Sequence, residues 1–86
     1  MKLVPLRQAQ VRYMNFMRQS QKDTLRLLTF KKDRSLTIKK EAGKWLLEES
    51  GFVHETILLD NHARKQLKQA FAREFPRSSR LYMQED

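Results

Sequence analysis

Apolar and polar residues alternate along much of the first 60 residues, and this pattern predicts β-strands. The clearest case is SLTIKK at 35–40, where Leu36 and Ile38 alternate with polar residues, as in a strand that buries one face. Similar segments, enriched in β-branched and aromatic residues, predict further strands at 11–18, 24–32 and 52–60. Together these segments predict an antiparallel sheet of three to four strands.

The segment EAGKWLLEESG at 41–51 fits two structures. Ala42, Trp45, Leu46 and Glu49 fall at helical spacing, and Gly51 suits the left-handed residue that often ends a helix. Gly43 disfavours a helix here by about 1 kcal/mol relative to alanine. The same residues also fit a strand followed by a turn at EESG. We favour a short helix and keep the strand as the alternative.

From Asp60 the apolar residues recur at helical spacing. Asp60 or Asn61 can cap a helix, and Pro76 ends it. The apolar stripe of this 60–75 helix consists of Ala63, Leu67, Ala70, Phe71 and Phe75. The opposite face is basic, with Arg64, Lys65, Lys68 and Arg73. We expect Leu67, Phe71 and Phe75 to pack on the sheet or in a dimer interface, and we rank direct contact of this helix with DNA second.

The two ends of the chain show no clear period. Residues 1–10 include Pro5 and are interpreted as a flexible or loosely docked arm, and 76–86 as a tail whose apolar residues Leu81, Tyr82 and Met83 could dock. The expected architecture is therefore one α+β domain at 11–75, an antiparallel sheet followed by a C-terminal amphipathic helix. A chain of 86 residues buries little surface on folding, so we expect a homodimer.

Charge is unevenly distributed along the chain. The formal net charge is +8 and the pI about 10.2. Residues 1–40 contain eleven Lys or Arg against two Asp, whereas 41–60 contain one Lys against five acids. There is no apolar run near the roughly 20 residues that span a bilayer, and no secretory signal at the start. These features predict a basic intracellular protein, cytoplasmic or nucleoid-associated, with no membrane partner.

The sequence lacks the residue sets on which most enzymes depend. It has no cysteine, which excludes disulfides, thiolate zinc sites and thiol nucleophiles. His54 and His62 lie on different predicted elements, and the only glycines, Gly43 and Gly51, form no phosphate-binding loop. We therefore expect a non-enzymatic protein without metal or cofactor.

The basic N-terminal half favours nucleic-acid binding. Lys and Arg along a sheet release counterions when they contact phosphates, and exposed aromatic rings stack on single-stranded bases. The candidate cations are Arg12, Arg18, Lys22, Arg26, Lys31, Lys32, Arg34, Lys39 and Lys40. The candidate rings are Tyr13, Phe16, Phe30 and Trp45. The alternatives are that the cations only solvate the domain and that the rings belong to its core.

The order of four strands and one helix, joined through TILLDNHARKQLKQAF at 56–71, resembles the positive-cofactor-four family of transcriptional coactivators. The resemblance implies a homodimer whose curved sheets form channels for single-stranded DNA, in replication, recombination or transcription. It would place Lys31, Lys32, Arg34, Lys39 and Lys44, with Trp45, on that surface. The family has a basic, glycine-containing loop before its last strand, whereas this chain has the acidic EESGFVHE.

A second resemblance covers a shorter segment. GKWLLEESGF at 43–52 is similar to a segment in SymE-like members of the AbrB swapped-hairpin superfamily. It implies a regulator of the AbrB or antitoxin type that binds duplex DNA. That fold needs another hairpin after residue 53, whereas this chain becomes helical at 60. We therefore rank this resemblance second. A basic protein-interaction module that docks on an acidic partner is the third hypothesis.

Overall fold

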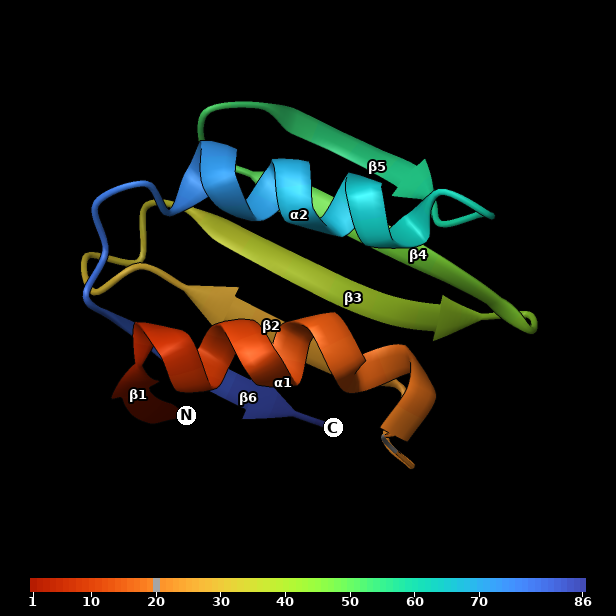
Figure 1. Ribbon diagram of the computed structural model, residues 1–86, viewed down its shortest axis with the longest axis horizontal. Helices are drawn as coiled ribbons and strands as arrows, with labels where there is room; N and C mark the ends of the chain where they lie inside the picture. The colour runs from red at the N-terminus through yellow and green to blue at the C-terminus, as the bar shows by residue number, and fades with distance from the viewer. Residues whose placement is uncertain (20) are drawn as a thin grey trace.

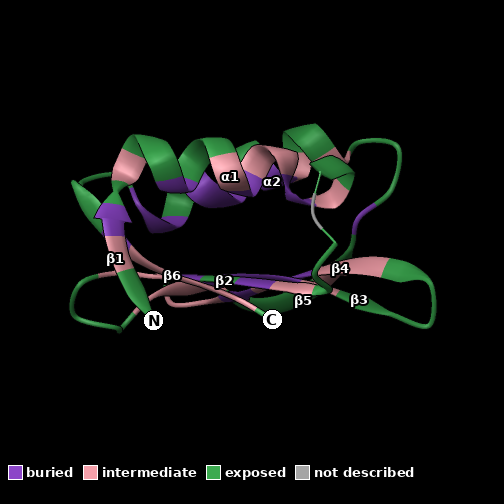
Figure 2. Ribbon diagram, turned by 90° about the horizontal axis from the view of Figure 1, so that it is seen from below, coloured by how far each residue is buried: buried purple, intermediate pink, exposed green. Residues whose placement is uncertain are grey.

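The computed structural model describes residues 1–19 and 21–86 and places both helices on one face of a six-stranded antiparallel sheet (Figure 1). The elements in chain order are β1 (Lys2–Pro5), α1 (Leu6–Gln19), β2 (Thr24–Leu28), β3 (Ser35–Glu41), β4 (Lys44–Ser50), β5 (His54–Leu58), α2 (Ala63–Glu74) and β6 (Arg80–Glu85). Across the sheet the strands follow the order β1-β6-β2-β3-β4-β5. No element of the described residues covers the other face, which we call the open face (Figure 2).

The core lies between the helices and the sheet. Alternate strand residues point into it, which confirms the prediction for Leu36 and Ile38. The strand residues in the core include Leu25, Leu27, Leu36, Ile38, Leu47 and Leu81. The helices contribute Ala9, Tyr13, Phe16, Leu67, Ala70 and Phe71. The α+β class is confirmed.

The predicted strand at 11–18 is wrong, because these residues belong to α1. Ala9, Tyr13 and Phe16 are the buried residues of this helix, and their spacing of four and three residues is that of one helical face. The segment 1–10 forms β1 and the first turns of α1 instead of a loose arm. Pro5 is tolerated because β1 is an edge strand.

The favoured helix at 41–51 is also wrong, and the alternative strand is correct. These residues form the turn and second strand of a hairpin in which Ile38 pairs with Leu47. Ala42 and Gly43 form its turn with φ of 52° and 79°. Two residues with positive φ match the right-handed twist of a hairpin, so local geometry favours this turn.

The C-terminal segment enters the sheet rather than forming a tail. β6 lies between β1 and β2, with Leu81 opposite Val4 and Met83 opposite Leu27. The sheet therefore has six strands instead of three or four, and α2 is not the last element. The strand and the helix predicted from the second half of the chain are confirmed as β5 and α2.

Candidate nucleic-acid interface

The middle of the open face carries charges of both signs. Arg26 on β2 lies opposite Thr37, and Lys39 on β3 lies one alternate position further along the same face. Lys39 Nζ donates to Glu48 Oε2 at 3.1 Å, and this hydrogen bond raises the pKa of Lys39. Because Glu48 neutralises Lys39 and Glu41 adds a further carboxylate, this part of the sheet is not a purely basic track.

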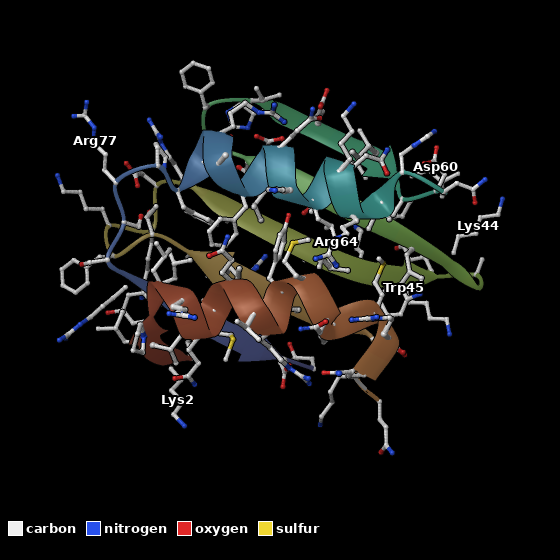
Figure 3. All side chains as sticks on the ribbon, in the orientation of Figure 1. Lys2, Lys44, Trp45, Asp60, Arg64 and Arg77 are labelled. Carbon is white, nitrogen blue, oxygen red and sulfur yellow. The ribbon has the colours of Figure 1, made fainter. Side chains whose placement is uncertain are left out.

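Positive charge gathers where three connections meet at one end of the sheet. We call this region, residues 29–34, 51–53 and 75–80, the loop end; it lies on the left in Figure 1. Its cations are Lys31, Lys32, Arg34, Arg77 and Arg80. An open cleft of about 680 Å³ lies here, lined by Lys31, Arg34, Arg77 and Arg80 together with Thr29 and Ser79. Arg77 projects from this end in Figure 3.

Aromatic rings lie among these cations. Phe30 is 67% exposed, and its ring stacks on that of Tyr82 with the centroids 6.2 Å apart and the planes 11° apart. Lys32 Nζ lies 4.9 Å from the centroid of the same Tyr82 ring. Arg34 Cζ lies 5.9 Å from the ring of Phe52, which is 70% exposed. The loop end thus combines solvent-exposed rings with positive charge.

One exposed acid of the loop end is held by its own loop. The hydroxyl of Thr29 donates to Asp33 Oδ1 at 2.7 Å, and this hydrogen bond is the main reason that the pKa of Asp33 is lowered. The carboxylate is therefore charged at neutral pH. It partly offsets the five surrounding cations.

A buried carboxyl pair supports the same region from behind. Glu74 is 1% exposed and accepts hydrogen bonds from the amides of Phe52 and Val53. Burial and a hydrogen bond with Glu49 raise the pKa of Glu74. Burial also opposes ionisation of Glu49, but hydrogen bonds from Arg73 and Glu74 outweigh it and lower the pKa of Glu49. The opposite shifts favour a neutral Glu74 beside an ionised Glu49. The oxygens of Glu74 fix the turn at 51–53 by accepting from the amides of Phe52 and Val53.

Two of the predicted stacking rings are unavailable to a ligand. Tyr13 and Phe16 are buried, and the Tyr13 hydroxyl donates to the carbonyl of Leu67 at 2.8 Å. Burial raises the pKa of Tyr13. Trp45 is half-buried with its ring edge-on to Phe16 at 5.8 Å, and Lys40 Nζ lies 5.6 Å from its centroid. Of the four predicted rings, only Phe30 is an exposed platform.

The cations predicted on one sheet surface lie in several places. Arg12 and Arg18 are on α1, across the sheet from the open face, and Arg12 pairs with Glu85. Lys22 lies between α1 and β2. Lys44 lies at the opposite end of the molecule from the loop end (Figure 3). The prediction of a single basic sheet surface made by the first forty residues is therefore wrong. Of the predicted cations, Lys31, Lys32 and Arg34 lie together at the loop end.

The apolar stripe of α2 lies inside the domain. Leu67, Phe71 and Phe75 are all buried. The ring of Phe71 lies 5.3 Å from Tyr13 and 5.2 Å from Phe75 between centroids. The predicted core role is confirmed, and the stripe is not free to form a dimer interface.

Sequence reasoning missed Tyr82, Arg77, Arg80 and Phe52. Arg80, Tyr82 and Gln84 alternate with the apolar Leu81 and Met83, and this alternation is the local signal for β6. Among the described residues, no three His, Cys, Asp or Glu side chains are grouped as metal ligands. No described helix has the length and hydropathy needed to cross a membrane.

Comparison of the chain with protein-family models, with curated proteins and with solved structures gives no match. The interface is therefore defined by its geometry alone.

Proposed function

We propose that the protein binds single-stranded nucleic acid, DNA in preference, at the loop end and the adjoining open face, without catalysing a reaction. The observation that carries the proposal is the exposed Phe30 ring, stacked on Tyr82 and surrounded by cations. Such binding would protect or present strands in replication, recombination or transcription.

The chemistry of the loop end suits both parts of a nucleotide. A base stacked on an exposed ring contributes about 1–3 kcal/mol regardless of its identity. Phosphates on either side of that base can contact Lys31, Arg34 and Arg80, and each contact releases counterions. A single strand is favoured over a duplex because its bases are free to stack on protein rings, whereas duplex bases already stack on one another.

The open face offers a path from the loop end onto the sheet. Tyr82 lies between Leu3 on β1 and Leu28 on β2, and Leu28 lies opposite Ser35 on β3. This row contains no acid. Arg26 lies one alternate position further along β2, where it can contact the backbone of the same strand.

Fluorescence anisotropy with single-stranded DNA, duplex DNA and RNA oligonucleotides across a salt series tests the proposal. Phe30→Ala should weaken binding of single strands by about five- to 150-fold, the equivalent of one lost stacked base. Lys31→Gln with Arg34→Gln should weaken binding of all single-stranded sequences alike and reduce the slope of log affinity against log salt by about 1.4. Lys44→Gln is the control variant, because Lys44 lies far from the loop end.

The outcomes separate the candidate functions. If the unmodified protein binds none of the three oligonucleotides, the proposal is rejected and docking on an acidic protein becomes the better hypothesis. Equal losses in the loop-end and Lys44 variants would reject the assigned surface. Binding of duplex DNA alone would favour the regulator hypothesis.

A homodimer remains part of the proposal, through a surface other than the α2 stripe. β5 is an edge strand that pairs only with β4 among the described strands. An exposed edge is a template for pairing with a second copy. Light scattering after size-exclusion chromatography measures the mass directly, and a monomer at every concentration tested would reject the dimer.

A further inference from the structure

The solvent side of the helix layer is basic and has no acid. We call it the helical face, with the cations Arg7, Arg18, Arg64, Lys65 and Lys68. The one acidic residue of either helix, Glu74, is buried. The helical face and the open face lie on opposite sides of the molecule (Figure 2). The two surfaces can therefore act separately.

A groove of about 330 Å³ runs between the two helices. It is lined by the cations Arg7, Arg64 and Lys68, the amide side chains of Gln10 and Asn15, and the apolar Val11 and Met14. In Figure 3, Arg64 extends from α2 over the space between the helices. The groove thus offers hydrogen-bond donors and positive charge without a carboxylate.

These cations are placed where they do not help the fold. Arg7 lies in the first turn of α1, and Arg64 and Lys65 lie in the first turn of α2. The positive end of a helix dipole favours acids there, and neither first turn has one. The acid nearest the start of α2 is Asp60, whose carboxylate accepts from the amide of His62. Arg64 and Lys68 also repel each other across one helical turn. Selection for stability alone does not explain this arrangement.

The groove cations also form no ion pair with an acid among residues 1–19 and 21–86. The ion pairs found among the described residues are Arg12 with Glu85, Lys39 with Glu48, and Arg73 with Glu49. None involves Arg7, Arg64 or Lys68. A surface built only for solubility mixes both signs, as the centre of the open face does. The helical face is therefore complementary to an external polyanion.

We infer that the helical face binds the phosphate backbone of double-stranded nucleic acid. The described residues of this face include no exposed aromatic ring, so it lacks the stacking platform that a single strand needs. The cations of this face, and the amide side chains beside them, can bind phosphates. Phosphates and sugars receive most protein hydrogen bonds to a duplex. The inference does not depend on the proposed function, because it uses the other side of the molecule.

The test is the double variant Arg64→Gln with Lys68→Gln, measured by anisotropy on duplex and single-stranded oligonucleotides. Each lost phosphate contact reduces the slope of log affinity against log salt by about 0.9. The double variant should therefore have a duplex slope shallower by about two and bind duplex about tenfold or more weakly in low salt. Binding of single strands at the loop end should be unchanged. Lys40→Gln with Lys44→Gln removes the same charge at the β3–β4 hairpin and is the matched control.

The inference is overturned if the unmodified protein does not bind duplex, or if both double variants lose the same duplex affinity. It is also overturned if vesicles of phosphatidylserine and phosphatidylcholine bind to the helical face while duplex does not. Circular dichroism checks that the variants remain folded. Phe30→Ala separates the two proposals, because it should weaken single-strand binding and leave duplex binding unchanged.

Discussion

Replacing Glu74 by glutamine or by alanine tests whether its buried carboxyl group holds the turn at 51–53. One oxygen of Glu74 accepts from the amide of Phe52 at 2.9 Å, and the other lies 3.3 Å from the amide of Val53. The same group is hydrogen-bonded to Glu49. Glutamine keeps a carbonyl acceptor for Phe52 and an amide that can donate to Glu49. Alanine keeps neither.

The alanine variant should be strongly destabilised. A buried polar group left without its partner costs about 1–3 kcal/mol. Two backbone amides lose their acceptor, and water can replace it only in part because the site of Glu74 is closed. We therefore expect the free energy of unfolding to fall by about 2–4 kcal/mol, a large share of the roughly 5–15 kcal/mol typical of a small domain.

The glutamine variant should be somewhat less stable than the unmodified protein in acid, because its Nε2 cannot accept from the amide of Val53, and should gain on the unmodified protein as pH rises. Burial, with the hydrogen bond to Glu49, raises the pKa of Glu74 in the folded state. The stability that Glu74 contributes is thus complete below the unfolded pKa of about 4.3 and is lost as pH rises through the folded pKa. Glu49 acts oppositely, since its folded pKa is lowered and its contribution is lost only as pH falls. Glutamine resembles the protonated acid and cannot titrate.

Urea unfolding followed by circular dichroism at pH 5 and pH 8 measures both effects. The stability of Glu74→Gln relative to the unmodified protein should rise between these two pH values, and Glu41→Gln, which removes an exposed carboxylate, is the control. A glutamine variant that is as unstable as the alanine variant at pH 8 would refute the raised pKa of Glu74. So would an unchanged pH dependence of its unfolding free energy.

Three further substitutions test the fold by the same urea assay. Ala42→Asn should raise the free energy of unfolding by about 0.5–1 kcal/mol, because asparagine tolerates the positive φ of 52° in this turn better than alanine, and a loss would contradict the turn geometry. Tyr13→Phe should lower it by about 1 kcal/mol through loss of the hydrogen bond to the carbonyl of Leu67, and no change would mean that this bond adds nothing. Gly51→Ala should lower it by about 1–3 kcal/mol, because Gly51 has φ of 153° and an added Cβ would lie 2.4 Å from a carboxylate oxygen; normal stability would show that the site can relax.

The parts of the fold that the sequence predicted are those with a clean local period. The alternation at 35–40 and the helical stripe from Asp60 both specify one face of one element, and both are found. The strand predicted at 11–18 is wrong because Tyr13 and Phe16 are common in both strands and helices. The helical spacing of the buried residues begins at Ala9, outside the predicted segment. The alternation at 80–84 is a local signal for β6, but the position of β6 between β1 and β2 could not be predicted because both partners are distant in sequence.

In the candidate site, too, the residues that are close in sequence could be predicted and those brought in by a distant strand could not. Phe30, Lys31, Lys32 and Arg34 are consecutive or nearly so, and the sequence alone identified them. Tyr82 joins them only because β6 pairs with β2 beside that loop. No local pattern encodes this contact, so the aromatic platform could not be predicted from the sequence.

The order of the strands turns the uneven charge of the sequence into a gradient across the sheet. Arg80 on β6 and Arg26 on β2 lie toward one side of the open face, whereas Glu48 on β4 lies toward the other. One row runs from Gln84 through Arg26 and Thr37 to Glu48, so its charge changes sign across four strands. A bound polyanion would be attracted over β6 and β2 and would gain little over β4, where Glu48 is paired with Lys39. For the proposed binding of a single strand, this distribution of charge favours a path on the side that carries the Phe30 and Tyr82 rings.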